Sequence, residues 1–480
     1  MGGVISVLGY LFLVAFSLIF IPQIIFYLIY VFYWLKSRRF VEPEVAEEYS
    51  GKVSFIIPVR REPLEYLENA VTYIGSLNIP DYEIIIVSDD DEETGRRLFQ
   101  KASELRRRGL RVWVIWRREP RGYRTGALNT GLFASSGDYI YVMDVDTRFD
   151  KCLLGKAIAL LKTSSDTAGV VGRWKPLNKE SRLPEAIAAS MDFVVNAIYK
   201  GRSAMGLSVF PLGTGTLFDK HLLQRELGGW DEERIQDDME IGTRLMGRGL
   251  KVAYVESCGV YVENPSSFRA FRIQQSRWAY GSVDAFLSRC REILRSKQKL
   301  IGKIEASIFL LQYVPAALAF TGTLVLASTV FFTPPSSVTI TPQYNLGIRI
   351  FLLWLIAEAT YGYVMHKEIR KSMSTWRALV NQGRIAAVTV AITPYVTYFV
   401  LRALLRRRMT YKRTPKGVMQ LTEIGDKLRI PVELLFGLFF AFAGVFSLMK
   451  GLFIPGMWLV LYGSGFLYVV LRWPRDVFLG

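Results

Sequence analysis

The chain has 480 residues, of which 51% are hydrophobic, and its 60 Lys and Arg outnumber its 43 Asp and Glu to give a formal net charge of +17. This length and composition exclude a single small soluble domain and predict a soluble catalytic module joined to a membrane part. The positive charge suits an anionic membrane face or a phosphate-bearing ligand, and nucleic acid is not an expected partner, because the basic residues gather beside apolar segments where the positive-inside rule accounts for them.

The first apolar segment runs from Val4 to Leu35 and exceeds the roughly 20 residues that a helix needs to cross a bilayer. It starts uncharged and ends in a basic cluster at 36–39, unlike a cleaved signal peptide, so we expect a retained transmembrane anchor over residues 1–40. The basic end predicts that the following domain is cytoplasmic. We therefore expect an integral protein of the plasma membrane with a cytoplasmic catalytic domain.

Residues 50–260 have the pattern of an α/β domain. Short β-branched runs alternate with helical stretches, the runs at 53–58, 83–87, 112–116 and 139–143 and the helices at 64–77, 94–108 and 125–134. This alternation predicts a mainly parallel, doubly wound, Rossmann-like sheet. Ligands of such sheets bind beyond the carboxyl ends of the strands. Two acidic motifs fall there, Asp89-Asp90 after the second strand and Asp144-Val145-Asp146 after the fourth.

The Asp144-Val145-Asp146 motif is the predicted metal site. If it continues the strand, its two carboxylates point to the same side of the chain. One Mn²⁺ or Mg²⁺ ion can then bridge them to a diphosphate, since both ions prefer oxygen ligands. Three scattered cysteines and two histidines offer neither a metal-ligand spacing nor a disulfide framework, so any metal must bind carboxylates. A solvated turn is the alternative interpretation of the isolated motif.

Three further motifs lie at predicted helix starts and at the border of the membrane part. The helix start Gly122 to Asn129 offers backbone N–H groups and Arg124 to an anion, although an ordinary helix start has the same pattern. Gln236 to Asp238 open a helix with an acidic first turn, which compensates a helix dipole as well. Gln274 to Trp278 border the membrane part, where an aromatic ring and a cation can also simply anchor an interfacial helix.

The C-terminal part predicts several membrane segments, at 304–332, 346–365, 385–401, 432–449 and 452–471. A full span at 385–401 would put the basic residues 406–416 outside the cell, against the positive-inside rule. Pro394 and Arg402 favour a re-entrant or interfacial segment there, with a full span as the alternative. We thus expect amphipathic interfacial helices at 261–300 and a membrane region at 301–480 with a basic cytoplasmic loop at 402–430.

Taken in order, these motifs resemble the family-2 inverting glycosyltransferases, in particular the membrane-embedded branch of cellulose, chitin and hyaluronan synthases. The family pattern is an acidic pair, a basic-x-Gly-Ala-Leu-Asn helix start, Asp-x-Asp, Thr-Glu-Asp and Gln-x-x-Arg-Trp. The matching residues are Asp89-Asp90, Arg124 to Asn129, Asp144 to Asp146, Gln236 to Asp238, and Gln274, Arg277 and Trp278. Arg124 replaces the usual lysine, and of the Thr-Glu-Asp triplet only the final residue, Asp238, is kept.

The resemblance implies a GT-A type catalytic domain and a binding site for a nucleotide-sugar donor. Asp89 or Asp90 would contact the base and ribose, Arg124 would lie in the donor site, and Asp144 would lie against the nucleotide sugar. Asp146 would coordinate the metal ion, Mn²⁺ or Mg²⁺, on the diphosphate.

The resemblance also implies the acceptor side of the site. Asp238 would be the general base that takes the proton of the acceptor hydroxyl. Gln274, Arg277 and Trp278 would lie where an indole can stack on the acceptor sugar and a guanidinium can neutralise the diphosphate. The segment Tyr411 to Lys416 resembles the family's cytoplasmic segment that swings over the nucleotide, while a basic membrane-surface loop explains it nearly as well.

These expectations leave three functional hypotheses. The first is a processive synthase that polymerises sugars from a nucleoside-diphosphate sugar, with a UDP-sugar as the expected donor, and exports the polysaccharide through its own membrane segments. The second is transfer of one sugar to a membrane lipid. The third is a receptor for nucleotide sugars, against which the retained Asp238 and Asp-x-Asp carboxylates argue. Seven aromatic or polar residues in the membrane region could line a channel for the polysaccharide, or could instead form interfacial belts. They are Tyr313, Trp354, Glu358, Tyr361, Tyr363, Tyr395 and Tyr398. The need for accessory subunits is left open.

Overall fold

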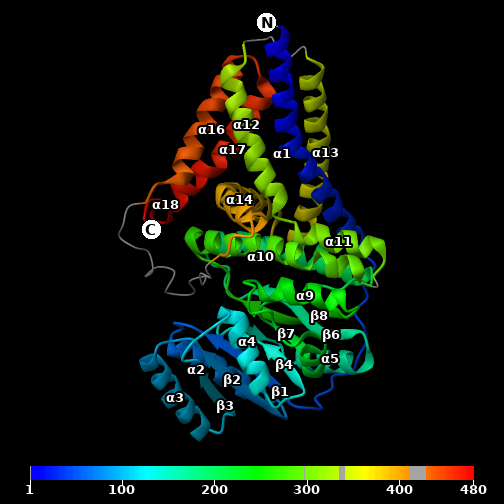
Figure 1. Ribbon diagram of the computed structural model, residues 1–480, viewed down its shortest axis with the longest axis vertical. Helices are drawn as coiled ribbons and strands as arrows, with labels where there is room; N and C mark the ends of the chain where they lie inside the picture. The colour runs from blue at the N-terminus through cyan, green and yellow to red at the C-terminus, as the bar shows by residue number, and fades with distance from the viewer. Residues whose placement is uncertain (1, 297, 335–340, 410–428, 480) are drawn as a thin grey trace.

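The computed structural model describes every residue except 1, 297, 335–340, 410–428 and 480. An α/β domain lies at one end of the molecule and long helices lie at the other, with α10 (Phe268–Arg295) and α11 (Leu300–Leu310) at the level between them (Figure 1). The N-terminal helix stands among the long helices, and the chain enters the α/β domain only after it. The predicted fold class, α/β with a mainly parallel sheet joined to membrane-type helices, is confirmed.

The α/β domain is built on one sheet, which has eight strands among the described residues, in the order β3-β2-β1-β4-β7-β6-β8-β5. Strands β1, β2, β3 and β4 are mutually parallel, as are β6 and β8, while β7 is antiparallel to β4 and β6, and β5 to β8. The first four strands confirm the sequence-based prediction to within one residue. The bounds are β1 Val53–Val59, β2 Tyr82–Ser88, β3 Val112–Trp116, β4 Tyr139–Val142, β5 Arg148–Phe149, β6 Thr167–Pro176, β7 Thr216–Asp219 and β8 Lys251–Val262.

Helices cover both faces of this sheet. Successive strand residues point to opposite faces, so Phe55 and Ile57 of β1 are buried against α2, α3 and α5, while Ile56 is buried with α4 and α9. The three predicted helices, α2 to α4, are confirmed to within two residues. The bounds are α2 Leu64–Ser76, α3 Glu92–Arg107, α4 Tyr123–Ala134, α5 Cys152–Thr163, α6 Arg182–Phe193, the π-helix η1 Val194–Tyr199, α7 Lys200–Ala204, α8 Lys220–Leu227 and α9 Asp237–Gly247.

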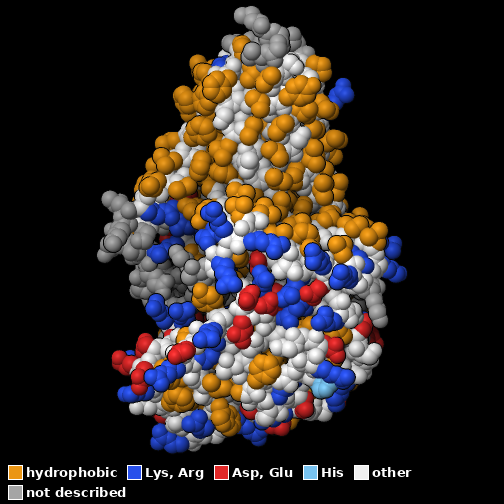
Figure 2. All heavy atoms as spheres, viewed as in Figure 1, with side chains coloured by type: hydrophobic (Ala, Val, Ile, Leu, Met, Phe, Trp, Pro, Cys, Tyr) orange, Lys and Arg blue, Asp and Glu red, His pale blue; other side chains and the backbone are white. Residues whose placement is uncertain are grey.

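The remaining helices form the other end of the molecule. Six of the described helices, α1, α12, α13, α14, α16 and α17, are long and apolar enough to cross a membrane by length and composition. Figure 2 shows hydrophobic side chains gathered over the long upright helices and charged ones over the α/β domain and the level of α10. The bounds are α1 Gly2–Ser37, α10 Phe268–Arg295, α11 Leu300–Leu310, α12 Val314–Phe332, α13 Pro342–Ile369, α14 Thr375–Leu404, α16 Val432–Met449, α17 Phe453–Arg472 and α18 Pro474–Phe478.

Two predicted membrane segments differ from the structure. The segment 304–332 is not one helix, because α11 ends at Leu310 and α12 begins at Val314 after a turn, with Pro315 in the first helical positions, where its missing N–H costs no hydrogen bond. The segment 385–401 lies within α14, a continuous helix that contains Pro394 and does not turn back on itself. Figure 1 shows α14 close to end-on beside α10, so its axis crosses those of the upright helices. Its placement relative to a membrane stays a prediction, and most of the predicted basic loop 402–430 lies outside the described residues.

The C-terminal helix α18 is tied to the start of α10. The Asp476 carboxylate accepts hydrogen bonds from the backbone N–H groups of Phe268, at 2.8 Å, and Arg269, at 3.4 Å. The first N–H groups of a helix have no partner within the helix. Asp476 therefore fixes the end of the helix that carries Gln274, Arg277 and Trp278.

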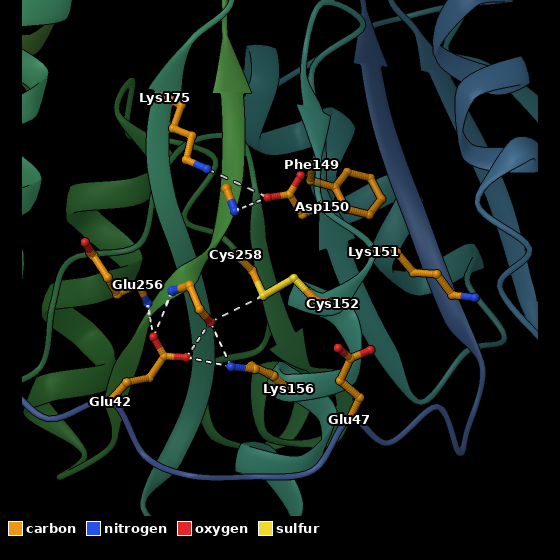
Figure 3. Close-up of a disulfide and its surroundings, with 12 residues drawn as sticks. Glu42, Glu47, Phe149, Asp150, Lys151, Cys152, Lys156, Lys175, Glu256 and Cys258 are labelled. Atoms are coloured by element: carbon orange, nitrogen blue, oxygen red, sulfur yellow. Dashed lines mark hydrogen bonds and ion pairs between the residues drawn. A yellow bond between two sulfur atoms is a disulfide. The ribbon is translucent and has the colours of Figure 1, made fainter. Parts of the chain in front are cut away.

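A disulfide links Cys152, the first residue of α5, to Cys258 in β8, with the Cα atoms 6.0 Å apart (Figure 3). This corrects the sequence analysis, which found no disulfide framework. The two cysteines are 106 positions apart, and only the packing of α5 against β8 brings them together. Close by, Glu42 of the linker between α1 and β1 accepts hydrogen bonds from the backbone N–H groups of Glu256 and Ser257, at 2.9 and 2.8 Å. The disulfide thus lies where this linker, α5 and β8 meet.

Candidate active site

A cavity of about 570 Å³ opens at the carboxyl ends of the central strands and continues past α10 to the long helices. Eight of the predicted site residues line it: Asp89, Arg124, Asp144, Asp146, Asp238, Gln274, Arg277 and Trp278. The structure therefore brings together motifs spread over about 190 residues of chain. The Tyr411 to Lys416 segment lies outside the described residues.

Asp90 is the one predicted site residue that does not line the cavity. Its carboxylate accepts hydrogen bonds from the backbone N–H of Arg61, at 2.5 Å, and from the Ser88 hydroxyl, at 2.9 Å. Both residues follow the end of β2 at Ser88, where strand alternation no longer applies, so packing decides which of them faces the cavity. The structure selects Asp89.

The Asp89 side chain is held in place by Arg117, which follows β3. Both of its oxygens accept hydrogen bonds from the Arg117 guanidinium, from Nε and a terminal nitrogen, each at 2.6 Å. Such a bidentate, charge-assisted pair fixes orientation as well as charge. Sequence reasoning missed Arg117, although its place at the end of a strand next to β2 was the available signal.

Arg124 joins three parts of the site. Its guanidinium donates to Asp144, at 2.7 Å, to Asp237, at 3.3 Å, and to the carbonyl oxygen of Gly213. The predicted anion-binding residue is thus engaged with carboxylates of two motifs. A donor diphosphate would compete with them for the guanidinium.

The Asp-x-Asp motif forms a turn rather than the end of a strand. β4 ends at Val142, and the N–H of Thr147 donates to the carbonyl oxygen of Asp144 at 3.1 Å. The expected strand alternation therefore does not apply. Both carboxylates still line the same cavity, because the Thr214 hydroxyl accepts from the Asp144 N–H at 3.0 Å and so fixes the turn.

The residues of the cavity fit a divalent ion that arrives with a diphosphate. The Asp146 side chain is 7% exposed and borders the cavity. Among the described residues, no group of three or more His, Cys, Asp and Glu could hold a metal alone. Mg²⁺ and Mn²⁺ often take only one or two protein carboxylates and complete their shell with substrate phosphate and water, and all-oxygen ligands suit both ions.

Asp238 lies in the first turn of α9 and faces the same cavity. Burial, together with the charge of neighbouring Asp237, raises the pKa of Asp238 to about 7, against the lowering effects of the Met239 N–H, Arg124 and Arg277. The Met239 N–H donates to the carboxylate at 2.7 Å. A carboxylate whose pKa is near neutral is matched to the work of a general base.

The end of the cavity where the resemblance predicts the acceptor is formed by α10 and the long helices. Gln274, Arg277 and Trp278 occupy positions i, i+3 and i+4 and so share one face of α10. Gln275 also lines the cavity and accepts a hydrogen bond from the Tyr313 hydroxyl at 2.8 Å. This bond joins α10 to the start of α12.

Two of the seven channel candidates, Tyr313 and Tyr361, line the cavity. The other five do not line it. The Trp354 ring N–H donates to Gln23 at 3.1 Å, and the Tyr395 hydroxyl donates to Glu433 at 3.0 Å. Tyr363 and Tyr398 are exposed, and Glu358 lies on α13 outside the lining. Sequence reasoning missed further lining residues of the membrane-side wall, Tyr30, Phe193, Phe309 and Gln312. They come from α1, α6, α11 and the turn that follows α11, and no local pattern marks them.

Comparison with known proteins agrees with this geometry. Residues 139–406 match the family described as glycosyl transferase family group 2. A probable glycosyltransferase of Sulfolobus acidocaldarius is 29% identical over 93% of this chain and 95% of its own length. Glucomannan 4-beta-mannosyltransferase 7 of Arabidopsis thaliana is 24% identical over 92% of this chain and 79% of its own length.

A solved structure shares the fold. A mannosyltransferase from Pyrobaculum calidifontis, in complex with GDP-Man and Mn²⁺, matches with a TM-score of 0.53 and 18% identity, over 83% of this chain and 100% of that one. This similarity confirms the predicted GT-A type architecture. Since the family match covers more than half of the sequence, the chain belongs to glycosyl transferase family group 2.

Proposed function

We propose that the protein transfers sugar units from a nucleoside-diphosphate sugar to an acceptor hydroxyl in a single inverting displacement. The observation that carries this proposal is the one cavity that holds Asp89, Asp146, Asp238 and Arg277 together. A nucleotide contact, a metal carboxylate, a base and a cation for the leaving group are the parts that this reaction needs.

In the proposed reaction Asp238 accepts the proton of the acceptor hydroxyl. The acceptor oxygen forms its bond to the anomeric carbon as the bond from that carbon to the diphosphate oxygen breaks, and the leaving nucleoside diphosphate keeps the electron pair. No covalent intermediate with the protein forms, so the configuration at the anomeric carbon inverts. The pKa of about 7 lets Asp238 be ionised near neutral pH and still hold a proton in the transition state.

The leaving group requires neutralisation of negative charge. Asp146, with Asp144 beside it, would hold Mn²⁺ or Mg²⁺, and when bound the ion stabilises charge on the departing diphosphate. Arg277 lines the same cavity and supplies a fixed positive charge. Asp89, oriented by Arg117, accepts hydrogen bonds from the base or ribose of the donor.

The named relatives favour a mannosyl donor. Both the plant relative and the structural neighbour are mannosyltransferases by name, and the latter was solved with GDP-Man. We therefore propose GDP-mannose as the first donor to test, with UDP-sugars, which the sequence led us to expect, as the competing donors.

The shape of the cavity favours a processive synthase over transfer of one sugar to a lipid. Beyond α10 the wall contains Tyr30, Tyr313 and Tyr361, and aromatic rings can stack on successive sugars of a growing chain. The glucomannan relatives agree with a polysaccharide product. Single transfer to a membrane lipid remains the alternative, because the same helices would face the lipid.

We place the α/β domain on the cytoplasmic side of the plasma membrane because α1 leads into it through the basic cluster at 36–39. A cysteine at Lys371, an exposed position after α13, tests this in a Cys290→Ser background. Labelling by an impermeant maleimide in inverted vesicles alone is the expected result. Labelling in intact cells would reverse the orientation.

The central experiment is transfer by the purified protein in detergent with Mn²⁺ or Mg²⁺ and a panel of labelled GDP- and UDP-sugars. Products of the wild type and of Asp238→Asn are separated by size and by organic extraction. High-mass product that is lost in the variant supports the synthase. Label confined to the organic phase would replace it by lipid glycosylation, and binding without turnover would favour a receptor.

A further inference from the structure

The segment 208–214, between α7 and β7, forms the wall of the cavity next to Asp238. Pro211, Leu212, Gly213 and Thr214 all line the cavity. A Cβ added at Gly213 would lie 3.4 Å from Oδ2 of Asp238, so this backbone is in close contact with the carboxylate. Any movement of the segment changes the surroundings of the proposed base.

Arg202 in α7 holds this segment from behind. It is 1% exposed, and its Nε and one terminal nitrogen both donate to the carbonyl oxygen of Ser208, at 3.1 and 2.8 Å. Its guanidinium carbon lies 5.0 and 4.6 Å from the ring centres of Phe210 and Phe309, which stack on each other at 4.7 Å. The two hydrogen bonds and the two aromatic rings fix the plane of the guanidinium, so this desolvated cation has one position.

The same segment is packed tightly against α9. A Cβ added at Gly242 of α9 would lie 2.6 Å from the Pro211 side chain and 2.9 Å from the Phe210 ring, which shows how closely these side chains approach the backbone of α9. α9 begins with Asp237 and Asp238. Arg202 fixes the position of Phe210, and Phe210 packs against α9. Arg202 therefore also influences the position of the helix that carries the proposed base.

Arg202 is also joined to the anchor helix. It forms an ion pair with Glu305 of α11, and the same carboxylate oxygen accepts a hydrogen bond from the Tyr33 hydroxyl near the end of α1. Removing one partner of a buried ion pair leaves the other charge without compensation, so such a pair holds its elements firmly. One carboxylate thus connects α1, α11 and α7.

We propose that Arg202 is a positioning residue for sugar transfer. Its contacts with Ser208 and Phe210 fix the position of the segment 208–214 relative to Asp238. Its ion pair with Glu305, which also binds Tyr33, couples that position to the packing of α1. This inference rests on the proposed function, in which Asp238 is the base. The competing explanation is that the ion pair only fastens the anchor helix to the α/β domain.

Arg202→Lys is the first test, because lysine keeps the charge for Glu305 but cannot offer two N–H groups of one plane to Ser208. We expect kcat to fall about tenfold with the KM for the donor within about twofold, since small misplacement of a reacting group is enough for such a loss. The acid limb of the pH profile should move to lower pH, because a loosened segment lets water reach Asp238 beside Asp237, Arg124 and Arg277. Tyr33→Phe should change both quantities in the same direction and less.

The matched control is Glu368→Gln. Glu368 is 3% exposed and accepts a hydrogen bond at 2.8 Å from the Trp34 ring, so it ties the same end of α1 to α13. Glutamine removes the charge that Glu368 presents to the Trp34 N–H and to Lys371, which should lower the melting temperature and leave kcat and the acid limb within about twofold of the wild type, as expected of a purely structural link.

The outcomes separate the two explanations. A wild-type kcat and acid limb in Arg202→Lys, or an equal loss of kcat in Glu368→Gln, would overturn the positioning role while leaving the transferase intact. If Arg202→Lys does not fold, the comparison of Tyr33→Phe with Glu368→Gln decides in the same way. A wild-type protein that transfers no sugar would remove the proposed function and this inference with it.

Discussion

Replacement of Asp238 by asparagine removes a charge and the ability to accept a proton at nearly constant shape. General base catalysis contributes typically 10²- to 10⁴-fold, so we expect kcat/KM of Asp238→Asn to fall by at least about 100-fold. In the proposed displacement the nucleoside diphosphate leaves from the side of the anomeric carbon opposite Asp238, so nucleotide affinity should change little. Turnover of labelled donor by purified variant, with nucleotide affinity measured separately by calorimetry, checks both expectations.

The raised pKa of Asp238 also predicts a pH profile. With a pKa of about 7, roughly 1% of Asp238 is ionised at pH 5 and roughly 90% at pH 8. Wild-type kcat/KM should therefore rise tenfold per pH unit below 7 and level off above it. The residual activity of Asp238→Asn should lack this limb.

Stability supplies an independent check. The folded-state pKa of about 7 lies above the unfolded value of about 3.9, so the folded state binds the extra proton. The contribution of this proton to the free energy of unfolding is fully present below about pH 4 and is lost as the pH rises through about 7. The loss amounts to at most about 4 kcal/mol. Asp238→Asn should consequently melt up to about 10 °C above the wild type at pH 8 without metal, and at the same temperature near pH 4.

A control variant separates charge removal from the loss of the base. Asp219 caps α8 by accepting a hydrogen bond from the Leu222 N–H at 2.8 Å, and asparagine caps equally well, so Asp219→Asn should stay within about twofold of the wild type. Asp238→Asn activity within tenfold of the wild type, or a surviving acid limb, would refute the role of Asp238.

Three other predictions follow from single contacts. Asp146→Asn should lower kcat/KM at least about 100-fold and weaken Mn²⁺ binding in the presence of nucleoside diphosphate, measured by electron paramagnetic resonance; unchanged Mn²⁺ binding would exclude Asp146 as a ligand. The disulfide closes a loop of 106 positions, which stabilises the folded protein by about 4 kcal/mol. The double variant Cys152→Ala with Cys258→Ala, or a reductant added to the wild type, should therefore lower the melting temperature by roughly 10 °C. A reductant should not change the melting temperature of the double variant. Asp476→Ala removes the hydrogen bond to the Phe268 N–H and should cost about 1 kcal/mol in thermal unfolding while the KM for the donor is kept; a changed KM would show that α10 shifts.

The sequence alone determined the local structure and the chemistry of the site. Alternating β-branched runs and helical stretches predicted β1 to β4 and α2 to α4 to within two residues, because periodicity is a property of neighbouring residues. The ordered motifs also identified eight residues that line one cavity. Parallel strands end at the same edge of a sheet, so motifs that follow such strands meet in space.

Only the tertiary structure decided which of these residues face one another. Asp89 faces the cavity and Asp90 does not, and Asp89 is held by Arg117, which no motif identified. The disulfide between Cys152 and Cys258 follows from the packing of α5 on β8.

The membrane-side wall and the position of Arg202 were likewise decided by packing. Tyr30 and Tyr361 reach the cavity from helices more than 300 residues apart, and Arg202 meets Glu305 and Tyr33 in the same way. A buried ion pair or an aromatic wall requires partners at fixed distances, and those distances exist only after helices and sheet have packed. Local patterns define the elements, whereas burial and close contact between distant elements define the site.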